Sequence, residues 1–312
     1  MELPKKVFIN EVVLRDGLQL EKKIVSLNEK KSLFDQLTKA NITMIEFGSF
    51  VHPKLVPQMA NSGDLYSDLS KEKQNANLVA LVPNLKGTEK AHDYGVERVN
   101  FVFSASNTHN LQNVHKSTED SLKELARIQD FCSKQDITLY VTIATAFGCP
   151  FEGEVSPNRV KSLVEEVSSL NVEMITLADT TGMANPYQVY NLMKEVRSLY
   201  SNQQFGLHFH NTRGMGLSNI LAGIQAGINS YDTALGGLGG CPFAPGATGN
   251  VCTEDVVHML HSMGIDTGIR LEELLVASAL LNKIVEHDTP SYILKAGTFD
   301  RKYPIPDSVS AQ

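Results

Sequence analysis

The stretch MITLADTTGMANPYQVYNLMKEVRSLYSNQQFGLHFH, residues 174–210, contains two short apolar runs separated by an amphipathic segment. Met174–Ala178 and Phe205–His210 have the length and composition of buried β-strands. Pro186–Tyr200 has the pattern of an α-helix between them. A strand, a helix and a second strand in this order form the repeating unit of a parallel sheet.

The same alternation runs along most of the chain and predicts eight strands. Eight successive strand–helix units are typical of one closed (β/α)8 TIM barrel. A doubly wound open sheet is the alternative, but it usually has fewer strands and a glycine-rich first turn, which is absent here. The predicted strands are Val7–Val12, Met44–Phe47, Leu78–Val82, Arg98–Phe103, Thr138–Ile143, Met174–Ala178, Phe205–His210 and Ser230–Ala234.

Helix start signals lie between these strands. Ser26 and Glu29 form a capping box, and Ser156-Pro157 is a favoured helix start. Thr253 offers a capping hydroxyl before two acidic residues. We expect one barrel domain over residues 1–290, with a C-terminal helical extension, and an arm or disordered tail over residues 291–312. Further predicted helices are Ser117–Gln135, Pro186–Tyr200, Leu217–Ala226, Thr253–Met263 and Leu271–Val285.

The overall composition excludes several classes of partner. The net charge of −7 and the lack of a long basic run argue against nucleic acid. No apolar stretch has the length of a membrane span, and the N-terminus MELPKK lacks the apolar core of a signal peptide. The four cysteines, at 132, 149, 241 and 252, do not suggest a disulfide framework, so we expect a cytoplasmic protein.

Polar residues stand where most of the predicted strands end. Catalytic groups of such barrels lie at the carboxyl ends of the strands. A barrel without catalytic activity has no need of this pattern, which therefore predicts an enzyme. The residues are Arg15 and Asp16 for the first strand, Glu46 and Ser49 for the second, then Asn84, Ser104, Thr145, Asp179, His208 and His210.

His208 and His210 are two residues apart on a predicted strand, so their side chains point to the same face. Two imidazoles at this spacing predict metal ligands. With Asp16 and Asn250 they would supply two nitrogens and two oxygens. This mixture suits Mg²⁺ or Mn²⁺, while Zn²⁺ and Co²⁺ are also compatible, and a structural zinc site would contain more cysteine.

The segment LGGLGGCPFAPGATGN, residues 235–250, contains six glycines and two prolines. Glycine is costly to order, so this density indicates unusual backbone angles or close approach to a ligand. A solvated linker is the alternative, but linkers are richer in Ser, Lys and Glu. We interpret the segment as a mobile active-site loop that carries the Cys241 thiol and ends at Asn250.

Motifs along nearly the whole chain resemble those of the hydroxymethylglutaryl-CoA lyase family. The glycine-rich segment with its cysteine is the most specific of them, whereas RDG and HxH are shared with broader relatives. The motifs are RDGLQ (15–19), IEFGSFVHPKLVPQM (45–59), VPNLKG (82–87), FGCPFEG (147–153), ADTTG (178–182), HFHNTRG (208–214), GGLGGCPFAPGATGN (236–250) and TED (253–255).

The resemblance implies cleavage of a 3-hydroxy-3-methylglutaryl-CoA-like substrate to acetyl-CoA and acetoacetate. It implies a divalent cation held by Asp16, His208, His210 and Asn250. It also implies a homodimer and an acyl-CoA partner.

The matching positions also assign catalytic roles. Arg15 would stabilise the enolate, Glu46 would support the site, and Cys241 would be the catalytic thiol. Asp16, His208 and a bound water are the candidates for removing the hydroxyl proton. The residues expected to contact the substrate are Arg15, Gln19, Ser49, Asn84 and Arg213.

Several residues near these motifs depart from the family pattern and leave the acyl group open. A related tertiary 3-hydroxyacyl-CoA is an alternative substrate, with Arg213 meeting a carboxylate or a CoA phosphate. A Claisen-type synthase on the same barrel and a non-catalytic metal- or acyl-CoA-binding barrel are the alternative functions. The departures are Leu20, Phe47, Gly48, Phe209, Asn211 and Arg213.

Overall fold

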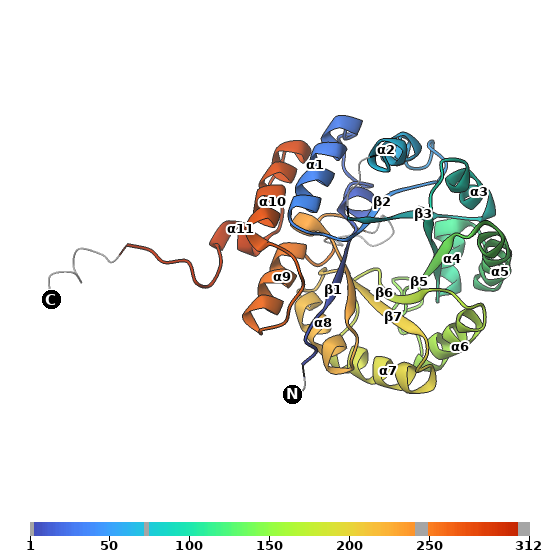
Figure 1. Cartoon of the computed structure of the whole chain (residues 1–312). Helices are drawn as coiled ribbons and strands as arrows, with labels where there is room; N and C mark the ends of the chain where they lie inside the picture. Colours follow the sequence, from blue (N-terminus) through green and yellow to red (C-terminus); the bar gives the residue numbers. More distant parts are fainter. Residues whose placement is uncertain (1–2, 72–74, 241–248, 305–312) are drawn as a thin grey trace.

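The computed structural model describes residues 3–71, 75–240 and 249–304, which form a closed barrel of eight parallel strands (Figure 1). Each strand pairs with the next, and β8 pairs with β1. The predicted TIM barrel is confirmed, and every predicted strand lies within two residues of an observed one. The strands are β1 (Phe8–Glu11), β2 (Met44–Ser49), β3 (Asn77–Val82), β4 (Arg98–Ser104), β5 (Thr138–Ala144), β6 (Met174–Asp179), β7 (Gln204–Phe209) and β8 (Ser230–Thr233).

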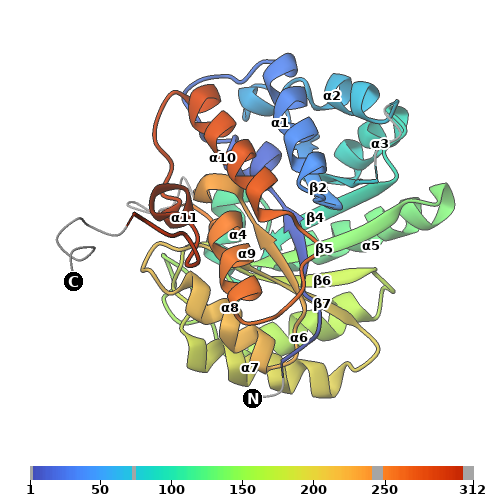
Figure 2. The same cartoon turned by 60° about the vertical axis from the view of Figure 1, so that its left-hand side comes forward.

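Helices surround the barrel in chain order (Figure 1). The predicted C-terminal helix, α10, packs against both α9 and α1 and so completes this outer layer (Figure 2). The helices are α1 (Leu27–Lys39), α2 (Ser62–Leu69), α3 (Leu85–Asp93), α4 (Asn107–Val114), α5 (Thr118–Gln135), α6 (Pro157–Ser168), α7 (Pro186–Leu199), α8 (Gly216–Gln225), α9 (Thr253–Ser262), α10 (Leu271–Val285) and α11 (Tyr292–Ala296). Three short turns each lie between a strand and the helix that follows it: η1 (Val13–Gly17), η2 (Pro57–Met59) and η3 (Leu235–Gly237).

Two of the three predicted helix starts are confirmed. Ser26 and Glu29 form the capping box of α1, and the Ser156 hydroxyl caps α6. The prediction that Thr253 caps α9 is wrong, because Cys252 occupies the N-cap position and no side chain caps this helix. The Thr253 hydroxyl donates to Glu11 Oε2 at 2.6 Å instead.

The helices α2, α3, α4 and α11 were not expected from the sequence. Gly63 and Gly87 lie inside α2 and α3, where glycine weakens helix propensity, so packing against the strands sustains these helices. The last, α11, lies in the segment expected to be an arm or tail. The backbone N–H groups of Tyr292 and Ile293 donate to Asp255 of α9, which fixes the start of this segment against the barrel.

The apolar core lies mainly between the strands and the helices, whereas the barrel interior carries a layer of polar side chains. Asn100 of β4 accepts a hydrogen bond from Thr142 of β5 at 3.1 Å and donates one to Glu46 of β2 at 3.1 Å. Barrel interiors are more often filled by apolar branched side chains. The polar layer therefore indicates a functional interior. Among the described residues, no helix is long and apolar enough to cross a membrane.

Glu11 is a fully buried acid that joins β1 to the elements following β8. Its Oε1 accepts from the backbone N–H groups of Val13 and Leu235, both at 2.9 Å, and its Oε2 lies 2.6 Å from the Thr253 hydroxyl. Burial raises the pKa of Glu11 to about 8, although the hydrogen bonds from Thr253, Leu235 and Val13 oppose this shift. The folded protein therefore holds a proton on this acid to a higher pH than the unfolded chain does.

We predict that Glu11→Gln, which mimics the protonated acid, removes a pH-dependent part of the stability. Because folding raises the pKa from 4.5 to about 8, the contribution of Glu11 is fully present below pH 4.5 and is lost as the pH rises through about 8. The unfolding free energy of the wild type should thus fall relative to that of the variant, by at most about 1.4 kcal/mol per pH unit. Urea unfolding at several pH values measures this difference. If the unfolding free energies of the wild type and the variant changed with pH in parallel, the prediction would be contradicted. The exposed Glu154→Gln is the matched control.

Candidate active site

Arg15 and Asp16 lie on η1, a single buried turn directly after β1. Arg15 Nε donates to Glu46 Oε2 at 2.5 Å, and its Nη1 donates to Asp16 Oδ1 at 2.6 Å. Burial alone would lower the pKa of Arg15, but Glu46 and Asp16 outweigh burial and raise it. The structure thus brings these three predicted residues together around one permanently charged guanidinium.

Asp16, His208 and His210 form a compact group of possible metal ligands. One potential ligand atom from each residue lies within 4.8 Å of those of the other two. His210 Nε2 is 3.9 Å from Asp16 Oδ2, and the two imidazole rings are 5.2 Å apart. All three side chains are buried, as expected of ligands that enclose a cation.

Asn250 is positioned by a short extended segment between the ends of β7 and β8. The Asn211 N–H donates to the Gly249 carbonyl at 3.0 Å, and the Val251 N–H donates to the Phe209 carbonyl at 3.0 Å. These bonds place Asn250 Nδ2 2.5 Å from Asp16 Oδ2. All four predicted metal ligands therefore meet at the mouth of the barrel.

The donor set fits a divalent cation. Asn250 Oδ1 is buried and has no hydrogen-bond partner among the described residues, which is costly unless it binds another group. It stands beside one carboxylate and two imidazoles. Nitrogen and oxygen donors in this mixture suit a moderately hard divalent ion.

The charges of the site depend on one another. Burial alone would raise the pKa of Asp16, but Arg15, His210 and His208 together lower it. Burial would lower the pKa of His208, but Asp232 and Asp16 together raise it above its ordinary value. A cation competes with a proton for an imidazole nitrogen, so its affinity depends on pH.

The glycine-rich segment approaches the site through Gly239, whose φ of +104° is disfavoured for residues with a side chain. A Cβ there would lie 2.5 Å from Asn250 Nδ2 and 3.0 Å from Asp16 Oδ2. Glycine is thus required for the backbone to pass the ligands. The predicted catalytic residue Cys241 lies outside the described residues.

Of the predicted substrate contacts besides Arg15, Gln19 joins this group and Ser49 lies at the end of β2. Gln19 Nε2 donates to Asp16 Oδ1 at 2.9 Å. Ser49 is buried at the end of β2, where its backbone N–H donates to Ser62 Oγ at 3.0 Å. Their contact with a substrate stays a prediction.

The other two predicted substrate contacts have local structural partners. Asn84 caps α3, with its Oδ1 accepting from the Gly87 N–H at 2.9 Å. Arg213 is exposed, and its Nη1 donates to the carbonyls of Thr181 at 3.1 Å and Gly182 at 2.9 Å. Arg213 therefore links the loop after β7 to the loop after β6.

Two of the residues that depart from the family pattern, Phe47 and Phe209, are buried in the apolar core. Phe47 packs against Tyr66 of α2 with ring centroids 5.3 Å apart, and Phe209 packs against Phe147 at 5.8 Å. Neighbouring residues of a strand point to opposite faces, so a residue next to an inward-facing ligand faces the helices. An irregularity in the pairing of β2 with β3 follows Glu46 directly.

Two further departures from the family pattern, Leu20 and Asn211, lie outside the ligand group. Leu20 is 45% exposed. Asn211 Oδ1 accepts from the Gly216 N–H at 3.0 Å and so shapes the loop before α8. These residues do not join the ligand group.

The structure adds residues that the sequence did not reveal. Asp232 Oδ2 lies 3.2 Å from His208 Nδ1, and Asn10 Nδ2 donates to Asp232 Oδ1 at 2.9 Å. Asn100 donates to Glu46 from the barrel interior. The available signal was an amide or acid in the middle of a predicted strand, where a buried sheet is usually apolar.

Comparisons with known proteins cover nearly the whole barrel. The HMGL-like family model matches residues 6–281. A hydroxymethylglutaryl-CoA lyase of Bacillus subtilis is 39% identical over 93% of this chain and 97% of its own. An (R)-citramalyl-CoA lyase of Chloroflexus aurantiacus is 40% identical over 93% of this chain and 95% of its own.

A solved structure is similar over almost the full length. The HMG-CoA lyase from A. baumannii, in complex with coenzyme A and 3-methylmalate, superimposes with a TM-score of 0.92 at 45% identity, covering 97% of this chain and 98% of its own. The family model, the relatives and this structure all span the barrel that carries the ligand group. The chain therefore belongs to the hydroxymethylglutaryl-CoA lyase family.

Proposed function

We propose that this protein is a divalent-metal-dependent carbon–carbon lyase. It cleaves 3-hydroxy-3-methylglutaryl-CoA, or a close tertiary 3-hydroxyacyl-CoA, to acetyl-CoA and a keto acid, which is acetoacetate for the first substrate. The observation that carries this proposal is the convergence of Asp16, His208 and His210 with the buried guanidinium of Arg15. A Claisen-type synthase is less well supported, since the similar proteins described above are lyases.

The substrate carries a tertiary hydroxyl at the carbon β to a thioester. Loss of the hydroxyl proton lets the oxygen form a ketone while the bond between C2 and C3 breaks. The electron pair passes to the thioester fragment, which leaves as an enolate. When bound, a divalent cation would acidify and orient the hydroxyl.

Arg15 is suited to stabilise the enolate oxygen. Its Nε and Nη1 are held by Glu46 and Asp16, so the guanidinium is fixed before the substrate binds. Within the described chain its Nη2 makes no hydrogen bond to a side chain and can serve the substrate. A fixed cation in a buried site stabilises developing negative charge without reorganisation.

The enolate carbon must then accept a proton to give acetyl-CoA. We assign this step to the Cys241 thiol, on the strength of the family motif that contains it. Gly239 passes directly beside Asp16 and Asn250, so the chain enters the glycine-rich segment at the site. The proposal also includes a homodimer and a cytoplasmic location, which the family resemblance and the cysteine content support.

Citramalyl-CoA is a second candidate substrate. The (R)-citramalyl-CoA lyase of Chloroflexus aurantiacus is 40% identical to this chain. Citramalyl-CoA also has a tertiary hydroxyl β to the thioester, but its carboxylate is one carbon closer to the reacting centre. The same chemistry would give acetyl-CoA and pyruvate.

We expect the purified protein to release acetyl-CoA from hydroxymethylglutaryl-CoA when Mg²⁺ or Mn²⁺ is present. EDTA should abolish release and added metal should restore it, because the hydroxyl is not acidified without a cation. Comparison of kcat/KM for hydroxymethylglutaryl-CoA and citramalyl-CoA identifies the acyl group. Release that persists in EDTA would contradict metal dependence, and no release from either thioester by metal-loaded protein would contradict the lyase.

We predict that Cys241→Ser lowers kcat by about 100-fold or more, since a hydroxyl is a weaker acid than a thiol. Its metal affinity should equal that of the wild type. Cys132→Ala, which changes a buried thiol in α5, is the control and should keep full turnover per folded molecule. Unchanged turnover in Cys241→Ser would remove the thiol from the mechanism.

We predict that Arg213→Ala raises the KM of the preferred thioester about tenfold, the equivalent of about 1.4 kcal/mol, with a smaller effect on kcat. The reason is loss of a cation on the loop that follows the two histidines. Arg127→Ala, on the exposed face of α5, is the control. Equal KM values for both variants and the wild type would exclude Arg213 from substrate binding.

A further inference from the structure

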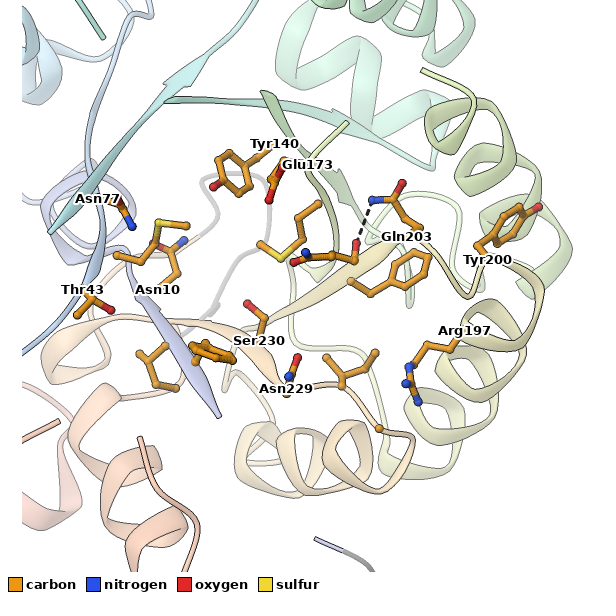
Figure 3. Close-up of a pocket in the computed structure, with 18 of the residues that line it drawn as sticks. Asn10, Thr43, Asn77, Tyr140, Glu173, Arg197, Tyr200, Gln203, Asn229 and Ser230 are labelled. Atoms are coloured by element: carbon orange, nitrogen blue, oxygen red, sulfur yellow. Dashed lines mark hydrogen bonds between the residues drawn. The ribbon is translucent and has the colours of Figure 1, made fainter. Parts of the chain in front are cut away.

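A cavity of about 760 Å³ lies at the end of the barrel opposite the ligand group. Its lining includes Asn77, Gln204 and Ser230, the first residues of β3, β7 and β8. Figure 3 shows Asn10 among the polar side chains around this cavity. Asn10 also borders a second cavity of about 10 Å³, which reaches Asp232 in the barrel interior. Asn10 thus lies between the large cavity at the end of the barrel opposite the ligand group and Asp232 in the barrel interior.

A line of hydrogen bonds leads from Asn10 to the metal-ligand group. Asn10 Nδ2 donates to Asp232 Oδ1 at 2.9 Å, and Asp232 Oδ2 lies 3.2 Å from His208 Nδ1. The three residues are direct neighbours on three adjacent strands, because Asp232 of β8 is in register with Asn10 of β1 and with His208 of β7. The pairing that closes the barrel therefore aligns them.

This arrangement determines which nitrogen of His208 can bind a cation. A carboxylate accepts hydrogen bonds, so the hydrogen between Asp232 and His208 resides on Nδ1. The Nε2 atom then carries the lone pair. Each oxygen of Asp232 has its own partner on a neighbouring strand, and this pair of contacts fixes the plane of the carboxylate.

The same design occurs a second time in the barrel. Asn100 Nδ2 donates to Glu46 Oε1 at 3.1 Å, and Glu46 Oε2 accepts from Arg15 Nε at 2.5 Å. In each case an amide of the barrel interior orients a carboxylate, and the carboxylate orients a reactive group at the mouth. If the Asn10 and Asn100 amides only filled space, both would not be expected to bind a carboxylate in this way.

We propose that Asn10 and Asp232 form a positioning pair that holds the ring and the tautomer of His208 for the divalent cation. This inference rests on the proposed metal-dependent function. Neither residue contacts the substrate or the cation; both act through His208. Carboxylates that orient a ligating histidine typically raise metal affinity 10- to 100-fold.

Mn²⁺ titration of the chelator-treated protein, followed by electron paramagnetic resonance, tests the proposal without reference to turnover. Asp232→Asn should weaken Mn²⁺ binding about 10- to 100-fold. Thr176→Val is the matched control, because Thr176 borders the same small cavity from β6 but makes no hydrogen bond to His208. It should bind Mn²⁺ as the wild type does. Equal losses in the two variants would overturn the proposal, since they would reflect the packing of the interior.

Asn10→Ala provides a second, independent variant. It should weaken Mn²⁺ binding in the same direction as Asp232→Asn but by less, because Asp232 remains. If circular dichroism shows that Asp232→Asn does not fold, wild-type affinity in Asn10→Ala overturns the proposal. In the folded proteins, ¹⁵N NMR of His208 should report hydrogen on Nδ1 in the wild type and a mixture of tautomers in Asp232→Asn.

The outcomes separate this inference from the proposed function. Failure of the wild type to bind Mn²⁺ would overturn the metal-dependent function itself. Tight binding by both the wild type and Asp232→Asn would leave that function in place and overturn only the positioning pair.

Discussion

The pairing of β1 with β8 is the contact on which the active site depends. Asp16 follows the first strand and Asn250 follows the last, yet their side chains lie 2.5 Å apart across a separation of 234 residues. In an open sheet these strands could lie at opposite edges. Closure also brings Asn10 into register with Asp232. The ligand group is therefore a property of the closed barrel, and no single part of the chain contains it.

The buried charges of this site are tolerable only because each has partners. Arg15 contacts two carboxylates, and Asp16 contacts a guanidinium, two amides and an imidazole. Buried ion pairs contribute little net stability, because desolvation offsets their attraction. Their value here is geometric, since every partner restricts the orientation of another. The apolar contacts between strands and helices supply the stability that this interior does not.

Much of the fold could be predicted from the sequence because short apolar runs and amphipathic segments alternate so regularly. The convergence of the possible metal ligands could be predicted as well, since two histidines at strand spacing must share a face and strand ends must meet at one end of a barrel. No feature of the sequence indicated which residues of neighbouring strands lie opposite each other. Asp232 was missed because its partner stands on a neighbouring strand, at a position that only the pairing of β7 with β8 defines.

Side-chain direction explains the other differences. Phe47 follows Glu46, which orients Arg15, and it faces α2 as the alternation of a strand requires. The Thr253 hydroxyl turns to Glu11 rather than to its own helix. For Thr253 a tertiary contact overrode the local signal of a helix cap. The roles expected of Cys241 rest on its motif, because the residue lies outside the described part of the chain.

The Asp16 carboxylate contacts both the Arg15 guanidinium and the other possible metal ligands. Asp16 Oδ1 accepts from Arg15 and Gln19, while Oδ2 faces Asn250 and His210. A cation bound to this carboxylate would weaken the interaction of Asp16 with the guanidinium. Metal occupancy and the position of Arg15 would then be thermodynamically coupled, and the coupling would be reciprocal. Substitutions at Asp16 and Arg15 consequently combine non-additively, and a deficit measured at either position belongs to the pair.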